Sequence, residues 1–169
     1  GRLVVGCNSG LYTSDNGGNS FTRRISTSYV ADIEIASNGV LYSSTRASGR
    51  VYKSTNNGTS WTLITPTGTT GRRVELACAP SDPNTIYAIA GARTSTNTDI
   101  SWFKKSVNGG TSWTNLTVPR YASNTSYHFT RKQAWYDLIL WVHPTNKNIV
   151  VAGGVDLHRT TNGGATWSP

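Results

Sequence analysis

The sequence predicts an all-β protein, and three observations carry this prediction. Of the 169 residues, 17 are glycine and 10% are aromatic, whereas only 14% are charged and methionine is absent. Short apolar segments recur at strand-like spacing, and none approaches the roughly 18 apolar residues of a membrane-spanning helix. One turn-like motif occurs four times. Frequent turns between β-branched and aromatic segments favour strands and argue against a helical bundle.

The repeated motif consists of Ser or Thr, any residue, Asn, any residue, Gly, any residue, Ser or Thr, and then Trp or Phe. Its copies begin at residues 14, 54, 106 and 160, so they start 40, 52 and 54 residues apart. The first, third, fifth and last positions are Ser14, Asn16, Gly18 and Phe21; Ser54, Asn56, Gly58 and Trp61; Ser106, Asn108, Gly110 and Trp113; and Thr160, Asn162, Gly164 and Trp167.

Each copy has the chemistry of a tight turn. The Asn side chain can hydrogen-bond to nearby backbone N–H groups, and the Gly supplies a positive φ without steric cost. We expect the final aromatic residue to start the next strand and to cover the hairpin. Basic residues at the ends of the preceding strands, Lys53, Lys105 and Arg159, are expected to form a solvated ladder along the rim.

Strand signals precede every copy of the motif. In chain order the expected strands are residues 3–5 and 11–12; 30–35, 40–42 and 51–52; 74–78, 86–89 and 100–103; and 136–142, 149–151 and 155–157. A fourth strand begins at each motif aromatic. Four antiparallel strands in every 40–54 residues are typical of a β-propeller blade. The sequence thus predicts a single partial β-propeller of about three and a half four-stranded antiparallel blades. It covers 1–169, with units at 1–28 (partial), 29–72, 73–134 and 135–169 (partial).

The motif resembles the Asp-box, or BNR, repeat of sialidases, sortilin-type Vps10 propellers, endo-xyloglucanases and many secreted bacterial proteins. Here Asn replaces the Asp that names the box, so the acceptor oxygen is kept and the charge is lost. The resemblance implies a structural role for the boxes and a secreted or cell-surface location. It also implies that the remaining blades of a longer chain complete the ring, with a closed four-bladed ring as the less favoured alternative.

The charge and the content of cysteine and histidine limit the classes of partner, disulfide and metal site that the sequence allows. Sixteen Lys and Arg against eight Asp and Glu give a net charge of +8, which favours acidic partners such as nucleic acid, anionic glycans or anionic surfaces. The two cysteines, Cys7 and Cys78, are expected to be buried free thiols two blades apart. The three histidines lie on different elements without metal-ligand spacing, so neither a metal nor another cofactor is expected.

The expected binding site lies on the face opposite the boxes, where the longest loops emerge. These loops run from about Gly91 to Asp99 and from about Pro119 to Ala134, and long loops on a rigid scaffold frequently carry function. Aromatic rings beside cations can hold a sugar or an anionic polymer. The candidate ligand-binding residues are Arg93, Arg120, Tyr121, Tyr127, His128, Arg131, Lys132 and Trp135.

Three carboxylates near the starts of inner strands are weaker, catalytic candidates: Asp32, Glu75 and Asp137. Two of them at suitable spacing would supply the acid and base of a glycosidase. Pairing with neighbouring cations, such as Arg72-Arg73 or Arg131-Lys132, is the alternative reading of the same carboxylates.

Two classes of function stay open. The favoured one is a non-catalytic propeller module that binds protein or glycan or acts as a scaffold. The alternative is a glycoside hydrolase of the sialidase or endo-xyloglucanase type. The resemblance to sialidases would require an Arg-Ile-Pro string ahead of the first box, whereas the nearest string, Arg24-Ile25-Ser26, follows one. Nucleic acid is an unlikely partner because no known recognition motif accompanies the charge.

Overall fold

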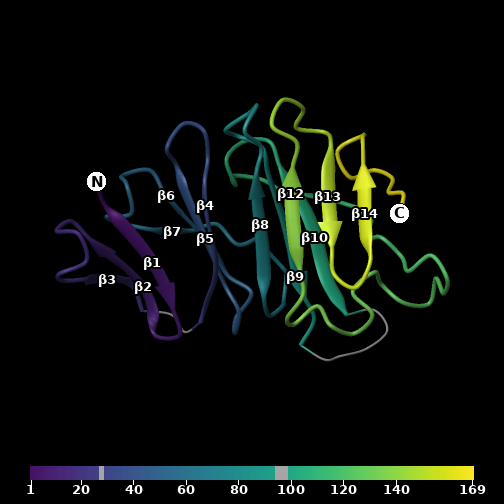
Figure 1. The fold of residues 1–169 in the computed structure, drawn as a ribbon, viewed down its shortest axis with the longest axis horizontal. Coiled ribbons are helices and arrows are strands. Elements are labelled where there is room, and N and C mark those ends of the chain that lie inside the picture. Colours follow the sequence, from purple (N-terminus) through teal and green to yellow (C-terminus); the bar gives the residue numbers. More distant parts are fainter. Residues whose placement is uncertain (27–28, 94–98) are drawn as a thin grey trace.

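The computed structural model describes residues 1–26, 29–93 and 99–169, and this part of the chain forms four antiparallel sheets and no helix (Figure 1). The strand orders are β1-β2-β3, β4-β5-β6-β7, β11-β10-β9-β8 and β12-β13-β14. The strands are β1 (Leu3–Cys7), β2 (Gly10–Ser14), β3 (Thr22–Ile25), β4 (Val30–Ile35), β5 (Leu41–Thr45), β6 (Val51–Ser54), β7 (Thr62–Leu63), β8 (Val74–Cys78), β9 (Ile86–Gly91), β10 (Ile100–Ser106), β11 (Thr114–Asn115), β12 (Ile139–Val142), β13 (Val150–Gly153) and β14 (Leu157–Thr160).

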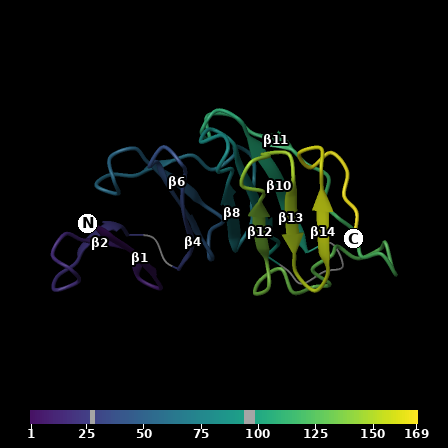
Figure 2. The same ribbon diagram turned by 45° about the horizontal axis from the view of Figure 1, so that its top comes forward.

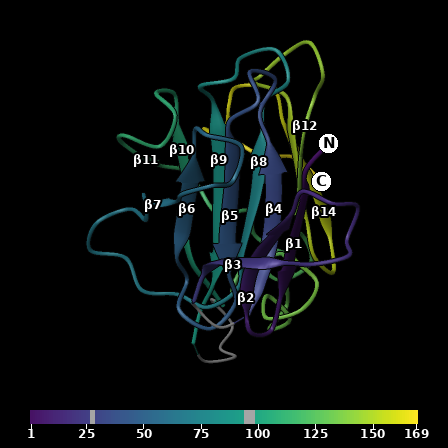
Figure 3. The same cartoon turned by 90° about the vertical axis from the view of Figure 1, so that its left-hand side faces the viewer.

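The sheets follow one another in chain order and pack face to face, as blades of a propeller do. The first strands of consecutive blades lie together, with β4 against β8 and β8 against β12 (Figure 1). Figure 3 looks onto the sheet of β4, β5 and β6, with β8, β9 and β10 behind it. The predicted all-β propeller architecture is therefore confirmed, and each sheet is called a blade below, blade 1 holding β1–β3 and blade 4 holding β12–β14.

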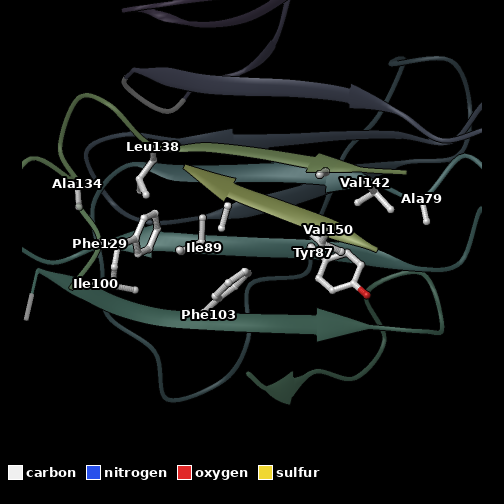
Figure 4. Close-up of a cluster of buried hydrophobic side chains, with 12 residues drawn as sticks. Ala79, Tyr87, Ile89, Ile100, Phe103, Phe129, Ala134, Leu138, Val142 and Val150 are labelled. Atoms are coloured by element: carbon white, nitrogen blue, oxygen red, sulfur yellow. The ribbon is translucent and has the colours of Figure 1, made fainter. Parts of the chain in front are cut away.

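Three apolar clusters fill the spaces between consecutive blades. One joins Leu11 and Ile25 of blade 1 to Tyr52 of blade 2, a second joins blades 2 and 3, and the third joins blades 3 and 4. Figure 4 shows the third cluster, in which Phe129 from the crossover packs with Ile89 of β9 and Leu138. Because each core lies between two sheets, the blades stabilise one another in neighbouring pairs.

The four boxes have the same hydrogen-bonded geometry. In the second box, Ser54 Oγ donates to Asn56 Oδ1 at 3.0 Å and accepts the Gly58 N–H at 2.9 Å. Asn56 Oδ1 also accepts the Ser60 N–H at 2.9 Å, and Asn56 Nδ2 donates to Ser60 Oγ at 2.8 Å. Both the fourth and the fifth positions adopt positive φ in every box, including Asn57 at 55°.

The box aromatic residues differ from the expectation that each covers its own hairpin. Only Trp61 bonds within its own box, through Nε1 to Gly58 O at 3.1 Å. Trp113 Nε1 instead donates to Ile64 O at 3.2 Å, and Trp167 Nε1 donates to Thr117 O at 2.9 Å, each in the preceding blade. Phe21 of the first box is 47% exposed, because no described blade precedes it.

The basic residues beside the boxes are also less solvated than expected. Lys53 Nζ donates to Gly109 O in the next blade's box at 2.9 Å, and Lys105 Nζ donates to Asn148 Oδ1 of blade 4 at 3.3 Å. Both lysines are half-buried, whereas Arg159 is exposed. The expected solvated ladder is thus wrong for the two lysines, which join neighbouring blades.

Two further expectations need correction. Cys7 and Cys78 are both free, as expected, but Cys7 is exposed because the strand that carries it, β1, is largely uncovered. The first strand of blade 4 begins at Ile139 rather than at residue 136. Its expected start is taken up by turns, in which the N–H groups of Tyr136 and Asp137 both donate to Gln133 O.

Candidate functional site

The candidate site lies on the face of the propeller opposite the boxes. In blades 2 to 4 each box follows the third strand, so the turn between second and third strands and the crossover to the next blade emerge at the opposite end. In blade 4 of Figure 2, β13 and β14 run in opposite directions, with the box beyond the end of β14. The face therefore gathers loops from several blades onto one scaffold.

The two long loops meet on this face, as the sequence predicts, although residues 94–98 of the first loop lie outside the described residues. Asp99 joins them, because its Oδ1 accepts the Thr130 hydroxyl at 2.5 Å and its Oδ2 accepts the Ala134 N–H at 2.9 Å. Next to it, Ile100 N–H donates to His128 Nδ1 at 3.0 Å. These buried bonds give the crossover from Pro119 to Ala134 a fixed shape.

His128 is held inside this junction. Its side chain is buried, and burial together with the nearby Arg120 charge lowers its pKa from 6.5 to about 4. A neutral ring is required at Nδ1, which accepts the Ile100 N–H. The geometry gives His128 a role in holding the loops, and its side chain faces no described cavity.

The other candidate ligand-binding residues are divided among three hollows. Tyr121, Tyr127, Arg131 and Lys132 line a small hollow with Asn124, of about 360 Å³. There Arg131 lies 4.5 Å from the centre of the Tyr121 ring, and Lys132 lies 5.6 Å from that of Tyr127. Arg120 lines a separate hollow beside Trp167. Arg93 and Trp135 belong to a third and larger one.

A cavity of about 710 Å³ is lined by four arginines and two aromatic rings. We call it the arginine cavity, and its lining residues are Tyr29, Arg46, Ala47, Arg72, Arg73, Ala92, Arg93 and Trp135. No described lining residue is acidic. Tyr29 is 44% exposed and Trp135 is 49% exposed, so both rings are available to a ligand.

Backbone hydrogen bonds fix the wall of the arginine cavity. Arg46 N–H donates to Tyr29 O at 2.7 Å, Arg72 N–H donates to Gly91 O at 2.8 Å, and Gly91 N–H donates to Arg73 O at 2.9 Å. The loops of blades 2 and 3 approach closely at Gly49, whose φ is 61° and where a Cβ would lie 2.9 Å from the Gly71 backbone. These contacts hold arginines from two blades around one space.

Sequence reasoning did not assign Tyr29, Arg46 or Arg72 to a ligand site. A signal was nevertheless present in the repeat register. Tyr29 and Arg73 each directly precede the first strand of a blade, whereas Arg46 and Arg93 follow the second strand of consecutive blades. Aligning the blades, rather than ranking the loops by length, would have brought these positions together.

The carboxylate candidates lie in different surroundings. Asp32 Oδ2 accepts the Leu76 N–H across the blade boundary at 2.9 Å. Glu75 pairs with Arg73 at 3.2 Å, and Arg73 also donates to Tyr136 O at 2.9 Å. Burial raises the pKa of Asp137, and the positive charge of the nearby Arg73 opposes this shift only in part. The buried Oδ1 atom of Asp137 has no hydrogen-bond partner among the described residues.

A further carboxylate, Glu34, lies among the first strands of the blades. Burial and the Asp32 charge raise the pKa of Glu34 to about 7, and burial with the same neighbouring charge raises that of Glu75 to about 7. These two groups therefore take up or release a proton near neutral pH. The period-two alternation of a strand places Glu34 on the same face of β4 as Asp32.

The described residues contain no cluster of three or more His, Cys, Asp or Glu side chains arranged to hold a metal ion. Within the same ranges, no helix is long and apolar enough to cross a membrane.

Comparison with known proteins finds relatives by structure alone. No family model matches the chain, and no curated protein does either. A GH74 enzyme from Niastella koreensis superposes with a TM-score of 0.76 at 21% identity, covering 98% of this chain and 28% of that one. The GH74 xyloglucanase from Xanthomonas campestris gives 0.68 at 22% identity, covering 99% and 26%.

A more distant similarity is to the NanB sialidase of Streptococcus pneumoniae, in a K499G mutant. It has a TM-score of 0.50 at 12% identity and covers 88% of this chain and 25% of that one. The chain thus spans about a quarter of the length of these structures. At these identities the likeness concerns architecture, and the chain shares the propeller fold of GH74 glycoside hydrolases.

Proposed function

We propose that this chain forms part of the polysaccharide-binding cleft of a β-propeller glycoside hydrolase. The observation that carries the proposal is the arginine cavity, with Trp135 and Tyr29 exposed on the face opposite the boxes. Flat aromatic side chains with polar neighbours suit the apolar faces and hydroxyl edges of sugar rings. The structural likeness to GH74 enzymes, one of them a xyloglucanase, supports the same class of reaction.

Asp137 is the candidate acid for this reaction. A general acid must hold its proton at working pH, and partial burial favours the protonated carboxyl. Arg73 connects Asp137 to the cavity, because it lines the cavity and bonds to the backbone on both sides of Asp137, at Tyr136 O and Leu138 O. The second carboxylate of such a pair would come from Glu75 or from outside this chain.

A non-catalytic module that binds glycan or protein is the second candidate, and a specific observation favours it. Asp32 accepts a backbone N–H of the next blade and Glu75 is paired with Arg73, so two of the three candidate carboxylates have structural partners. Either function suits a secreted or surface-displayed protein, because polysaccharides are met outside the cell.

The test measures hydrolysis and binding of xyloglucan and of other polysaccharides by the protein and its Asp137→Asn variant. The matched control is Asp156→Asn, because Asp156 is also half-buried with an unpartnered oxygen but lines none of the described cavities. Hydrolysis lost only in Asp137→Asn supports the enzyme. Binding without hydrolysis, weakened by Trp135→Ala, supports the second candidate. An absence of both activities rejects the proposal.

A further inference from the structure

The charge of the arginine cavity points to one class of polysaccharide. We infer that the cavity selects an acidic polysaccharide, whose carboxylate or sulfate groups pair with its arginines; this inference rests on the proposed function. Arg46 and Arg93 enter from the turns of blades 2 and 3, and Arg72 and Arg73 enter from the crossover between these blades. Four cations thus surround one concave space of about 710 Å³.

The cations are not neutralised from within the cavity. The eight carboxylates of the chain lie elsewhere, and of the four arginines only Arg73 has an acidic partner in the described ranges, Glu75. The side chains of Arg46 and Arg72 are exposed. Like charges held together in this way repel one another, and an anionic ligand removes that repulsion.

The guanidinium group matches this chemistry specifically. It is planar and carries five N–H donors in a fork that binds carboxylate or sulfate oxygens in pairs. The backbone of three of the four arginines is held by the hydrogen bonds of the cavity wall, at Arg46, Arg72 and Arg73, so little backbone ordering accompanies binding. A neutral polysaccharide would use the aromatic rings and leave the guanidinium groups to water.

The cavity fits a sugar chain better than it fits nucleic acid. A cavity of about 710 Å³ falls within the roughly 300–1,000 Å³ of small-ligand sites. Its described lining holds two aromatic rings, Tyr29 and Trp135, whereas sites for single-stranded nucleic acid stack successive bases on a series of rings along a basic groove. Trp135 lies at the cavity with its ring 5.0 Å from that of Tyr136, which limits how the indole can turn toward a ligand.

The experiment compares binding of polygalacturonate, chondroitin sulfate and neutral xyloglucan by the protein and two triple variants. The test variant is Arg46→Gln, Arg72→Gln and Arg93→Gln. The control is Arg23→Gln, Lys104→Gln and Arg159→Gln, which removes the same charge from positions outside the arginine cavity. Far-UV circular dichroism and thermal unfolding show that each variant is folded.

We expect the test variant to lose about tenfold or more in affinity for an acidic polysaccharide, from three partly exposed ion pairs, and to lose clearly less in affinity for neutral xyloglucan. The control should change both affinities by less than about twofold. Polygalacturonate carries carboxylates alone, whereas chondroitin sulfate carries both carboxylates and sulfates, so tighter binding of chondroitin sulfate would indicate that sulfate groups contribute. Raising the salt concentration should weaken acidic binding, because exposed charges are screened.

Three results would overturn the inference without rejecting the proposed function, and a fourth would reject the proposed function itself. Equal affinity for neutral and acidic chains would reject charge selection and leave the proposed function standing. Equal losses in the test and control variants would show a response to net charge alone. Displacement of the acidic polysaccharide by a DNA oligonucleotide of equal charge, at equal affinity, would replace glycan recognition with polyanion binding. Failure to bind any polysaccharide would reject the proposed function itself.

Discussion

Lys53 Nζ donates a hydrogen bond of 2.9 Å to the carbonyl oxygen of Gly109, which lies 56 residues further along the chain in the box of the next blade. The lysine lies over the Tyr42 ring, 6.0 Å from its centre. Arg2 makes the same kind of contact one blade earlier, where Nη1 donates to Asn57 O at 2.9 Å. Thus, at the boundary between blades 1 and 2 and at that between blades 2 and 3, a basic side chain of one blade donates to the backbone carbonyl of the fourth residue in the next blade's box.

Replacing this cation should weaken the boundary between blades 2 and 3. We expect Lys53→Met to lower the free energy of unfolding by about 1–2 kcal/mol, because a half-buried charged hydrogen bond is lost. Urea unfolding measures the change. Arg159→Met is the control, since this exposed residue occupies the equivalent position in blade 4, and it should change stability by less than about 0.5 kcal/mol. Equal effects would contradict a role for the Lys53 contact.

Trp113 provides a second test of the same boundary. Trp113→Phe removes the hydrogen bond to Ile64 O and should cost about 1 kcal/mol. Trp113→Ala also removes partly buried ring surface and should cost about 2–3 kcal/mol, less than the roughly 3–5 kcal/mol of a fully buried aromatic. Thermal or urea unfolding measures both values. An alanine variant as stable as the phenylalanine variant would show that packing of the Trp113 ring does not contribute to stability.

Glu34 should make stability depend on pH near neutrality. Its pKa is raised to about 7 in the folded protein from an ordinary value of 4.5, so its stabilising contribution is fully present below 4.5 and is lost as the pH rises through about 7. Glu34→Gln should therefore raise the melting temperature relative to wild type at about pH 8 more than at about pH 5. A difference that is independent of pH would refute the assignment. Glu75→Gln is a useful contrast, because it also removes the Arg73 pair.

His128 should respond to acid in the opposite sense. Its pKa is lowered to about 4 from 6.5, so its contribution is fully present above 6.5 and is lost as the pH falls through about 4. Protonation of Nδ1 would oppose the N–H of Ile100. We expect the Ile100 amide to lose protection from hydrogen exchange as His128 takes up its proton, with both followed by NMR. Protection that persists after protonation would contradict the bond.

The sequence was sufficient to predict the architecture, because the information about it is local and repeated. The box at Ser54 to Trp61 carries its own turn chemistry, and strand signals such as residues 74–78 needed only alternation and apolar content. The side-chain contacts between blades were less accessible. Nothing near Trp113 in the sequence indicates that its N–H reaches Ile64 in the preceding blade.

The candidate site was predicted in part. Loop length predicted which face carries the site and which two loops form it, and it included Arg93 and Trp135 among the candidates. Asp99 joins the two loops through its hydrogen bonds to Thr130 and Ala134. Loop length could not separate Tyr121 and Lys132 from Trp135, because the turns of the crossover direct these side chains to different hollows. Arg46 was missed because it lies in a short turn, where only the packing of blade 2 against blade 3 brings it to the cavity.

The asparagine at the centre of each box has a consequence for the chemical ageing of this protein. Three of these residues, Asn16, Asn108 and Asn162, directly precede glycine, the context in which a flexible chain loses the asparagine amide most readily, as the next backbone nitrogen attacks the side-chain carbon. Here Asn108 is held at its oxygen by Ser112 N–H and at its nitrogen by Ser112 Oγ. The fold itself thus protects these amides, and slow deamidation at Asn108 would report on how often the turn opens.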